Sequence, residues 1–133
     1  MRTMKMKNKE IVTFLNTCTG LKQKHLPVRL AYAIKKNISA VQEAAAAYSA
    51  EREELINRYA KKDDSGDPVI ENDCYVMEDK AGFTKDMSDL LDIETEVEIH
   101  TVSLAVVEKC DDDPKYDALT MEELDVIDCM LTE

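Results

Sequence analysis

The side chains that could carry catalysis are sparse in this sequence and do not form a recognisable set. Its 133 residues include two histidines, His25 and His100. A histidine that activates a serine or cysteine nucleophile needs it within hydrogen-bonding reach, and the spacing gives no argument for such a partner. His100 falls instead in an alternating stretch, which indicates a side chain on the polar side of a strand. An enzyme that uses either histidine is the weakest hypothesis, and we expect no enzymatic activity.

Sites for metals and phosphates are not indicated either. The three glycines are isolated and cannot form a phosphate-binding loop. The acidic loop at 63–67 resembles half of a calcium-binding loop, but its glycine is misplaced and its twelfth position lacks a glutamate. No two cysteines form a Cys-x-x-Cys pair, so we expect reduced thiols, no cofactor and no metal. The cysteines are Cys18, Cys74, Cys110 and Cys129.

Charge is divided unequally along the chain. Residues 1–62 contain 13 Lys or Arg and 5 Asp or Glu, whereas residues 63–133 contain 4 and 23. One interpretation is that the two halves attract each other within the monomer. The other is that the acidic half faces a basic partner, such as the nucleic-acid-binding groove of another protein. Since the net charge of −11 repels phosphate, we expect no direct binding of nucleic acid.

If the acidic half binds a partner, two groups of carboxylates are the candidate contacts. The first group alternates along a predicted strand, and the second precedes Pro114 in a predicted loop. Carboxylates at a strand edge also prevent aggregation, and loop aspartates are often only solvated, so a purely structural role stays open for both. The candidate partner-binding residues are Glu94, Glu96, Glu98, Asp111, Asp112 and Asp113.

One long helix must position these candidates. Pro27 suits its first position, and we predict that it ends near Lys62. Apolar or small residues recur along it with the three–four spacing of a coiled-coil seam, interrupted by Arg52, which either extends to the edge or fixes the register against an acidic partner. The seam consists of Ala31, Ile34, Ile38, Val41, Ala45, Tyr48, Arg52, Leu55 and Tyr59. It needs a partner, which is either another part of the chain or a second copy.

Shorter helices are predicted on both sides of the long one. The first begins at Asn8 and stops at Gly20 through a left-handed cap. Another covers residues 81–92. The last covers residues 121–130 and opens with a capping box.

Two regions are predicted to form strands. Residues 69–77 are typical of a hairpin, and residues 95–107 alternate with a change of phase that suggests a bulge near His100 and Thr101. Together they predict a small antiparallel sheet. The expected fold is one α+β domain over residues 1–133, with a basic helical arm (1–62) and an acidic α+β part (63–133).

The sequence contains no recognisable membrane-spanning stretch or secretion signal. No stretch approaches the roughly 20 apolar residues of a membrane span. The first residues are basic but lack the apolar core of a secretion signal. We therefore expect no membrane association and an intracellular location.

Four segments resemble an uncharacterised family of small proteins encoded by phages and prophages of Gram-positive bacteria. They are Lys7–Ile11, Leu26–Asn37, Glu94–His100 and Leu119–Leu131. The resemblance implies a phage-encoded protein in the host cytoplasm. It implies no activity and transfers no functional residues.

In that context, two binding functions are the leading hypotheses. The first is a stoichiometric inhibitor of a host defence or nucleic-acid-processing machine, which presents carboxylates where phosphates would lie, as anti-CRISPR proteins and DNA mimics do. The alternative is a virion or assembly component that forms a homo-oligomer through the long helix. The first depends on salt-sensitive charge and the second on apolar burial.

Overall fold

A single long helix, α2 (Val28–Tyr59), runs through the computed structural model, which describes residues 1–133. The other helices are α1 (Asn8–Leu21), α3 (Lys80–Leu91), α4 (Leu104–Asp112), α5 (Met121–Ile127) and the short 3-10 helix η1 (Asp128–Met130). The strands are β1 (Arg2–Lys7), β2 (Ile70–Glu71), β3 (Cys74–Tyr75), β4 (Glu94–Ile99), β5 (Val102–Ser103) and β6 (Leu131–Thr132). The α+β class predicted from the sequence is confirmed.

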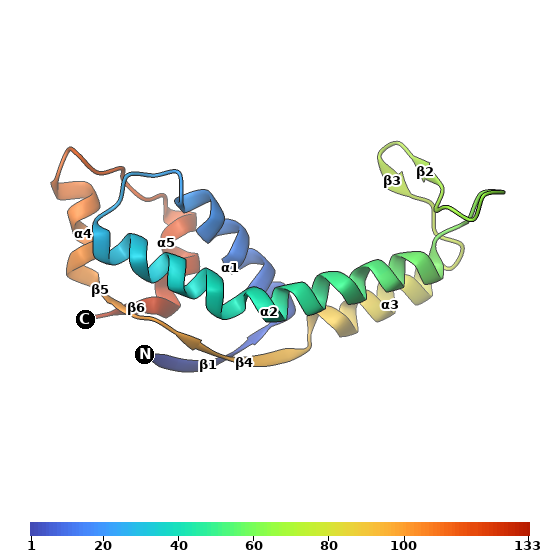
Figure 1. The fold of residues 1–133 in the computed structure, drawn as a ribbon, viewed down its shortest axis with the longest axis horizontal. Coiled ribbons are helices and arrows are strands. Elements are labelled where there is room, and N and C mark those ends of the chain that lie inside the picture. Colours follow the sequence, from blue (N-terminus) through green and yellow to red (C-terminus); the bar gives the residue numbers. More distant parts are fainter.

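The elements are divided between two regions along α2 (Figure 1). In the body, residues 1–45 and 94–133, the first half of α2 packs with α1, α4, α5 and the β1–β4 ribbon. In the arm, residues 46–93, the second half of α2 carries α3 and the β2–β3 hairpin away from the body. No helix is both long enough and apolar enough to cross a membrane.

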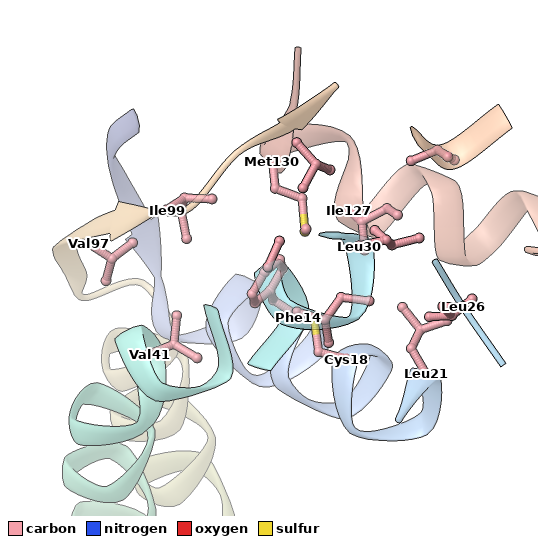
Figure 2. Close-up of a cluster of buried hydrophobic side chains, with 14 of the residues drawn as sticks. Phe14, Cys18, Leu21, Leu26, Leu30, Val41, Val97, Ile99, Ile127 and Met130 are labelled. Atoms are coloured by element: carbon pink, nitrogen blue, oxygen red, sulfur yellow. The ribbon is translucent and has the colours of Figure 1, made fainter. Parts of the chain in front are cut away.

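One hydrophobic core of 18 buried residues holds the body together. Figure 2 shows Phe14 of α1, Leu30 of α2, Ile99 of β4 and Met130 of η1 converging on it. Phe14 is its only phenylalanine, so the core is mainly aliphatic. Four further buried apolar residues lie outside this core, and all of them are in the arm: Leu55, Ile56, Ala60 and Leu90.

Helix α1 ends one residue later than predicted, and the left-handed cap expected at Gly20 is wrong. Gly66 is the only glycine with a positive φ, and the helix continues through Gly20 to Leu21. Leu21 lies three residues after Cys18 on the same face, and both are fully buried. Burial of this additional leucine favours a further helical residue over an early stop.

The seam predicted along α2 finds its partners within the chain. Ile34, Val41 and Ala45 belong to the core of the body, where α1 and β4 contact α2. Leu55 is buried in the arm, where α3 contacts α2. The helix ends at Tyr59, three residues before the predicted Lys62.

The buried face of α2 is wider than a coiled-coil seam. Leu30, Ala33 and Asn37 are also buried, although they lie outside the predicted spacing. A helix that packs against both a helix and a strand needs such a broad stripe, whereas a coiled coil needs only a narrow one. Arg52 is exposed and forms no ion pair, which agrees with a side chain that extends to the edge of the seam.

The expected sheet has different partners from those predicted. β4 pairs antiparallel with β1, a strand that the sequence analysis missed, and β2 pairs with β3. The register sets Met4 against Val97 and Met6 against Thr95 on the inner face of the β1–β4 ribbon, with Met6 and Val97 buried. Methionine is not a characteristic strand residue, so residues 2–7 gave no strand signal and were described only as basic.

The predicted hairpin is confirmed at β2 and β3. Asn72 and Asp73 connect the strands with φ of 53° and 63°. Two adjacent residues with positive φ form the turn that matches the twist of a two-residue hairpin. The helix predicted next is α3, and Asp79 caps it by accepting a hydrogen bond from the Gly82 N–H at 3.0 Å.

Only the first part of the strand predicted at 95–107 is confirmed. It consists of two separate strands, β4, which ends at Ile99, and β5, which ends at Ser103. The following residues form α4, whose first turn Ser103 caps by accepting a hydrogen bond from the Ala105 N–H at 3.1 Å. Val107 and Cys110, three residues apart, are buried on one face. Burial therefore follows a helical period after the cap, and the apolar alternation in the sequence was misleading.

The side chain of Asn37 binds the backbone of His100, which lies between β4 and β5. Its side chain is fully buried; Nδ2 donates to the His100 carbonyl at 3.0 Å, and Oδ1 accepts from the His100 N–H at 2.7 Å. The change of phase predicted near His100 is real, but the strand ends there and no bulge forms. A side chain of α2 thus takes the place of a neighbouring strand for this residue.

The last helix begins with the predicted capping box. The Thr120 hydroxyl accepts from the Glu123 N–H at 3.1 Å, and Glu123 Oε1 accepts from the Thr120 N–H at 2.8 Å. Lys24 Nζ lies 2.7 Å from the same carboxylate oxygen. Burial alone would raise the pKa of Glu123, but these hydrogen bonds and the Lys24 charge outweigh it and lower the pKa.

Replacing Asn37 with leucine, which has a similar shape, should destabilise the protein. The substitution leaves the His100 N–H and carbonyl without partners, and each such group costs about 1–3 kcal/mol when buried. We expect the free energy of unfolding to fall by about 2–4 kcal/mol in urea denaturation. Ser39→Ala, at an exposed position of the same helix, is the control, and equal stability of the two variants would contradict this role.

Candidate functional site

A groove lies where α3 and β4 meet the side of α2. Its volume is about 910 Å³, and 16 residues line it, eight of them hydrophobic. We call it the acidic groove, for the charged residues described below. Because it spans the junction of the arm and the body, residues far apart in the sequence contribute to it.

Buried apolar side chains form the floor of the acidic groove. Leu55 comes from α2, Leu90 from α3 and Val97 from β4, and all three are buried. The α2 side is lined by alanines at positions with a spacing of four and three, which lie on one face of a helix. They are Ala40, Ala44 and Ala47. Ile93, at the end of α3, also lines the groove and is 54% exposed.

Asn8 holds the end of α3 in position beside the groove. Its Nδ2 donates to the Leu90 carbonyl at 2.8 Å, and its backbone N–H donates to the Ile93 carbonyl at 3.0 Å. Asn8 is buried at the first turn of α1. These bonds connect the arm to the body, so the wall formed by Leu90 and Ile93 has a fixed place.

The charged residues of the groove are five carboxylates and one arginine. Arg58 lies 4.0 Å from Asp86, which also accepts a hydrogen bond from the Tyr59 hydroxyl at 2.6 Å. That hydrogen bond is the main reason that the pKa of Tyr59 is raised. The other four carboxylates are exposed, and none takes part in an ion pair or a side-chain hydrogen bond: Glu43, Glu51, Asp89 and Glu96.

This arrangement has two features of a binding surface. Unpaired carboxylates attract a cationic surface, and the exposed Ala40, Ala47 and Ile93 offer apolar area to be covered. The residues that line the groove include no histidine, cysteine, serine or lysine. No group of three or more His, Cys, Asp or Glu side chains lies close enough together to hold a metal ion.

The two histidines are apart from the groove, and each lies against a tyrosine ring. The His25 and Tyr116 ring centroids are 6.0 Å apart, and those of His100 and Tyr32 are 5.7 Å apart, nearly perpendicular. His100 is half-buried.

The predicted contact residues on β4 face solvent, where basic residues of β1 partly offset them. Glu94, Glu96 and Glu98 are exposed on the outer face of the ribbon. The residues directly opposite them are Lys7, Lys5 and Thr3. Opposite charges in such cross-strand positions attract each other. Of the three glutamates, only Glu96 lines the acidic groove.

The predicted contact residues at 111–113 lie on a different part of the surface. Asp111 and Asp112 end α4 instead of occupying a loop, and that end of α4 lies at the far edge of the body from β4 (Figure 1). Asp113 accepts a hydrogen bond from the Lys115 N–H at 3.1 Å and lies 3.8 Å from the Lys115 ammonium. The six predicted residues therefore do not form one surface.

Ion pairs within the chain account for part of the charge asymmetry. Four of the five ion pairs join residues 1–62 to residues 63–133, the closest being Lys24–Glu123 at 2.7 Å. The body contains 15 acidic and 11 basic residues, whereas the arm contains 13 and 6. One of these pairs, Lys24–Glu123, lies within the body, Arg58–Asp86 lies within the arm, and Lys7 and Lys9 join the body to Asp92 of the arm. Most of the negative excess remains on the arm.

Sequence reasoning missed most of the residues of α2 that line the groove. Tyr48 and Leu55 belong to the predicted seam, but Ala44, Ala47, Glu43 and Glu51 were not singled out. A signal was present, because small residues on one helical face beside unpaired acids indicate a surface left open. Comparisons with protein-family profiles, with curated proteins and with solved structures find no match. The phage resemblance therefore stays a prediction.

Burial divides the four free cysteines into reactive and protected thiols. Cys74 is exposed in β3, whereas Cys18 and Cys110 are buried and Cys129 is half-buried. Burial and the neighbouring Cys129 raise the pKa of Cys18 to about 12. Burial also raises the pKa of Cys110 and of Cys129. Because the thiolate is the nucleophile, these three react slowly near neutral pH.

Iodoacetamide at pH 8 should alkylate Cys74 first in the native protein. Cys18 and Cys110 should react only after denaturation, since their thiols are buried and protonated. Mass spectrometry of the intact protein and of its peptides measures the order, and Cys74→Ser should remove the fast phase. Alkylation of Cys18 at the rate of Cys74 would show that the core is open.

Proposed function

We propose that this chain is a non-enzymatic protein-binding protein of phage origin, which inhibits a host defence or nucleic-acid-processing machine by binding it stoichiometrically. The observation that supports the proposal best is the acidic groove, where four unpaired carboxylates surround an apolar floor. A host target of this kind places the action of the protein in the host cytoplasm. The phage origin rests on the resemblance described from the sequence.

A basic protein is the partner that fits these charges. Surfaces that bind nucleic acid are rich in Lys and Arg, and an acidic arm attracts them before contact. The arm projects from the body, so its negative excess is open to a partner (Figure 1). Covering the exposed Ala40, Ala47 and Ile93 adds burial energy that salt does not screen.

The alternative, an assembly component that oligomerises through α2, has less support. The most apolar residues of the seam, such as Ile34 and Val41, are already buried in the core. A second copy would therefore meet a largely occupied face.

Reversing two charges of the groove should abolish capture of a basic host protein. Glu43→Lys with Glu51→Lys changes the net charge by the same amount as Asp111→Lys with Asp112→Lys, at the far edge of the body. In pull-downs from a bacterial lysate, we expect the first pair to lose a nucleic-acid-binding protein that the unaltered protein retains at low salt. The second pair should retain it.

Four results would count against the proposal. Equal loss in both double variants would mean that only net charge matters, and loss in the second alone would move the site to α4. Capture that does not weaken at high salt would contradict the role of charge. A stable oligomer in solution, with no captured protein, would favour the assembly function.

A further inference from the structure

We infer that the acidic groove binds one amphipathic helix of the partner, with an apolar stripe flanked by Lys or Arg, lying along α2. The inference rests on the proposed protein-binding function and names the element of the partner that the groove would take. It depends on three features: the alanines of α2, the length of the groove and the unpaired acids around it.

The alanine positions favour a helix over an extended strand. Ala40, Ala44 and Ala47 follow the spacing of one helical face, and their small side chains allow another helix axis to come within the usual 8–10 Å. The side-chain rows on such a face leave grooves that take the side-chain ridges of a second helix. Since α2 and α3 already pack together in the arm, an added helix would complete a group of three.

The extent of the groove sets the length of the helix. Its residues on α2 begin at Ala40 and end at Arg58, which is about 27 Å at 1.5 Å per residue. A helix of about 18 residues covers that distance. Its apolar side chains would cover the exposed Ala40, Ala47 and Ile93, the last of which is 54% exposed in this chain.

The acids around the groove set the charge of the helix. Glu43 and Glu51 are eight residues apart on α2, about 12 Å along its axis. Asp89 comes from α3 and Glu96 from β4. Carboxylates from three elements therefore surround the apolar floor, so the fitting helix has cations on both flanks of its apolar stripe. An anionic or neutral amphipathic helix lacks this complementarity.

A synthetic 18-residue peptide of leucine and lysine with a helical apolar period is the probe. We expect it to bind the full chain in a fluorescence anisotropy titration at low salt and to gain helical circular dichroism when bound. A scrambled peptide of the same composition, and a peptide with glutamate in place of lysine, should each bind at least about tenfold more weakly.

Two matched variants test whether the peptide occupies the groove. Ala47→Phe fills the groove, whereas Ala46→Phe adds the same side chain at an exposed position of α2 that does not line it. We expect Ala47→Phe to raise the Kd of the leucine–lysine peptide about tenfold or more, the usual effect of blocking an interface centre. Ala46→Phe should change the Kd less than twofold.

Several outcomes would overturn the inference. No binding of the leucine–lysine peptide, equal binding of the scrambled peptide, or equal effects of the two phenylalanine variants would each do so. If the peptide fails while the lysate partner is still lost on Glu43→Lys with Glu51→Lys, the groove binds a different structure and the proposed function stands. If the peptide binds in the groove but no basic partner is captured, the proposed function fails and the helix site stands.

Discussion

The two hydrogen bonds between the Asn37 amide and the backbone of His100 are the contact on which the arrangement of the body depends. β4 stops at Ile99, and β5 begins at Val102, so the residues between them lack a ladder partner. A buried peptide group must be paired, and one amide supplies both a donor and an acceptor. The chain can therefore leave the β1–β4 ribbon and continue to β5, which pairs with β6 and brings Met130 into the core.

The same helix that provides Asn37 also supports the arm. Its first half shares a core with α1, β4 and the C-terminal elements. Its second half packs mainly against α3 and ends next to the short β2–β3 hairpin. Charge follows this division, because the body contains 15 acidic and 11 basic residues and the arm contains 13 and 6. The arm keeps an excess of acids that a basic partner would meet.

The acidic groove arises at the boundary of these two regions. Alanines extend α2 at little conformational cost, but they do not fill the space beside α3 and β4. Leu90 and Val97 close the floor, and Ile93 remains more than half exposed. Four unpaired carboxylates from α2, α3 and β4 surround this floor, and this combination underlies the proposed binding of a cationic helix.

The sequence by itself determined the elements with strong local signals. The long helix, the hairpin turn at Asn72 and Asp73, and the capping box at Thr120 depend on contacts within a few residues, so local periodicity and turn chemistry predict them. Only the tertiary structure decided which segments pair. β1 joined β4 across some ninety residues, α4 replaced a predicted strand, and the acids at 94–98 and 111–113 fell on separate surfaces. Burial and backbone pairing between distant residues decide these outcomes, and a periodicity along one segment carries no information about its distant partner.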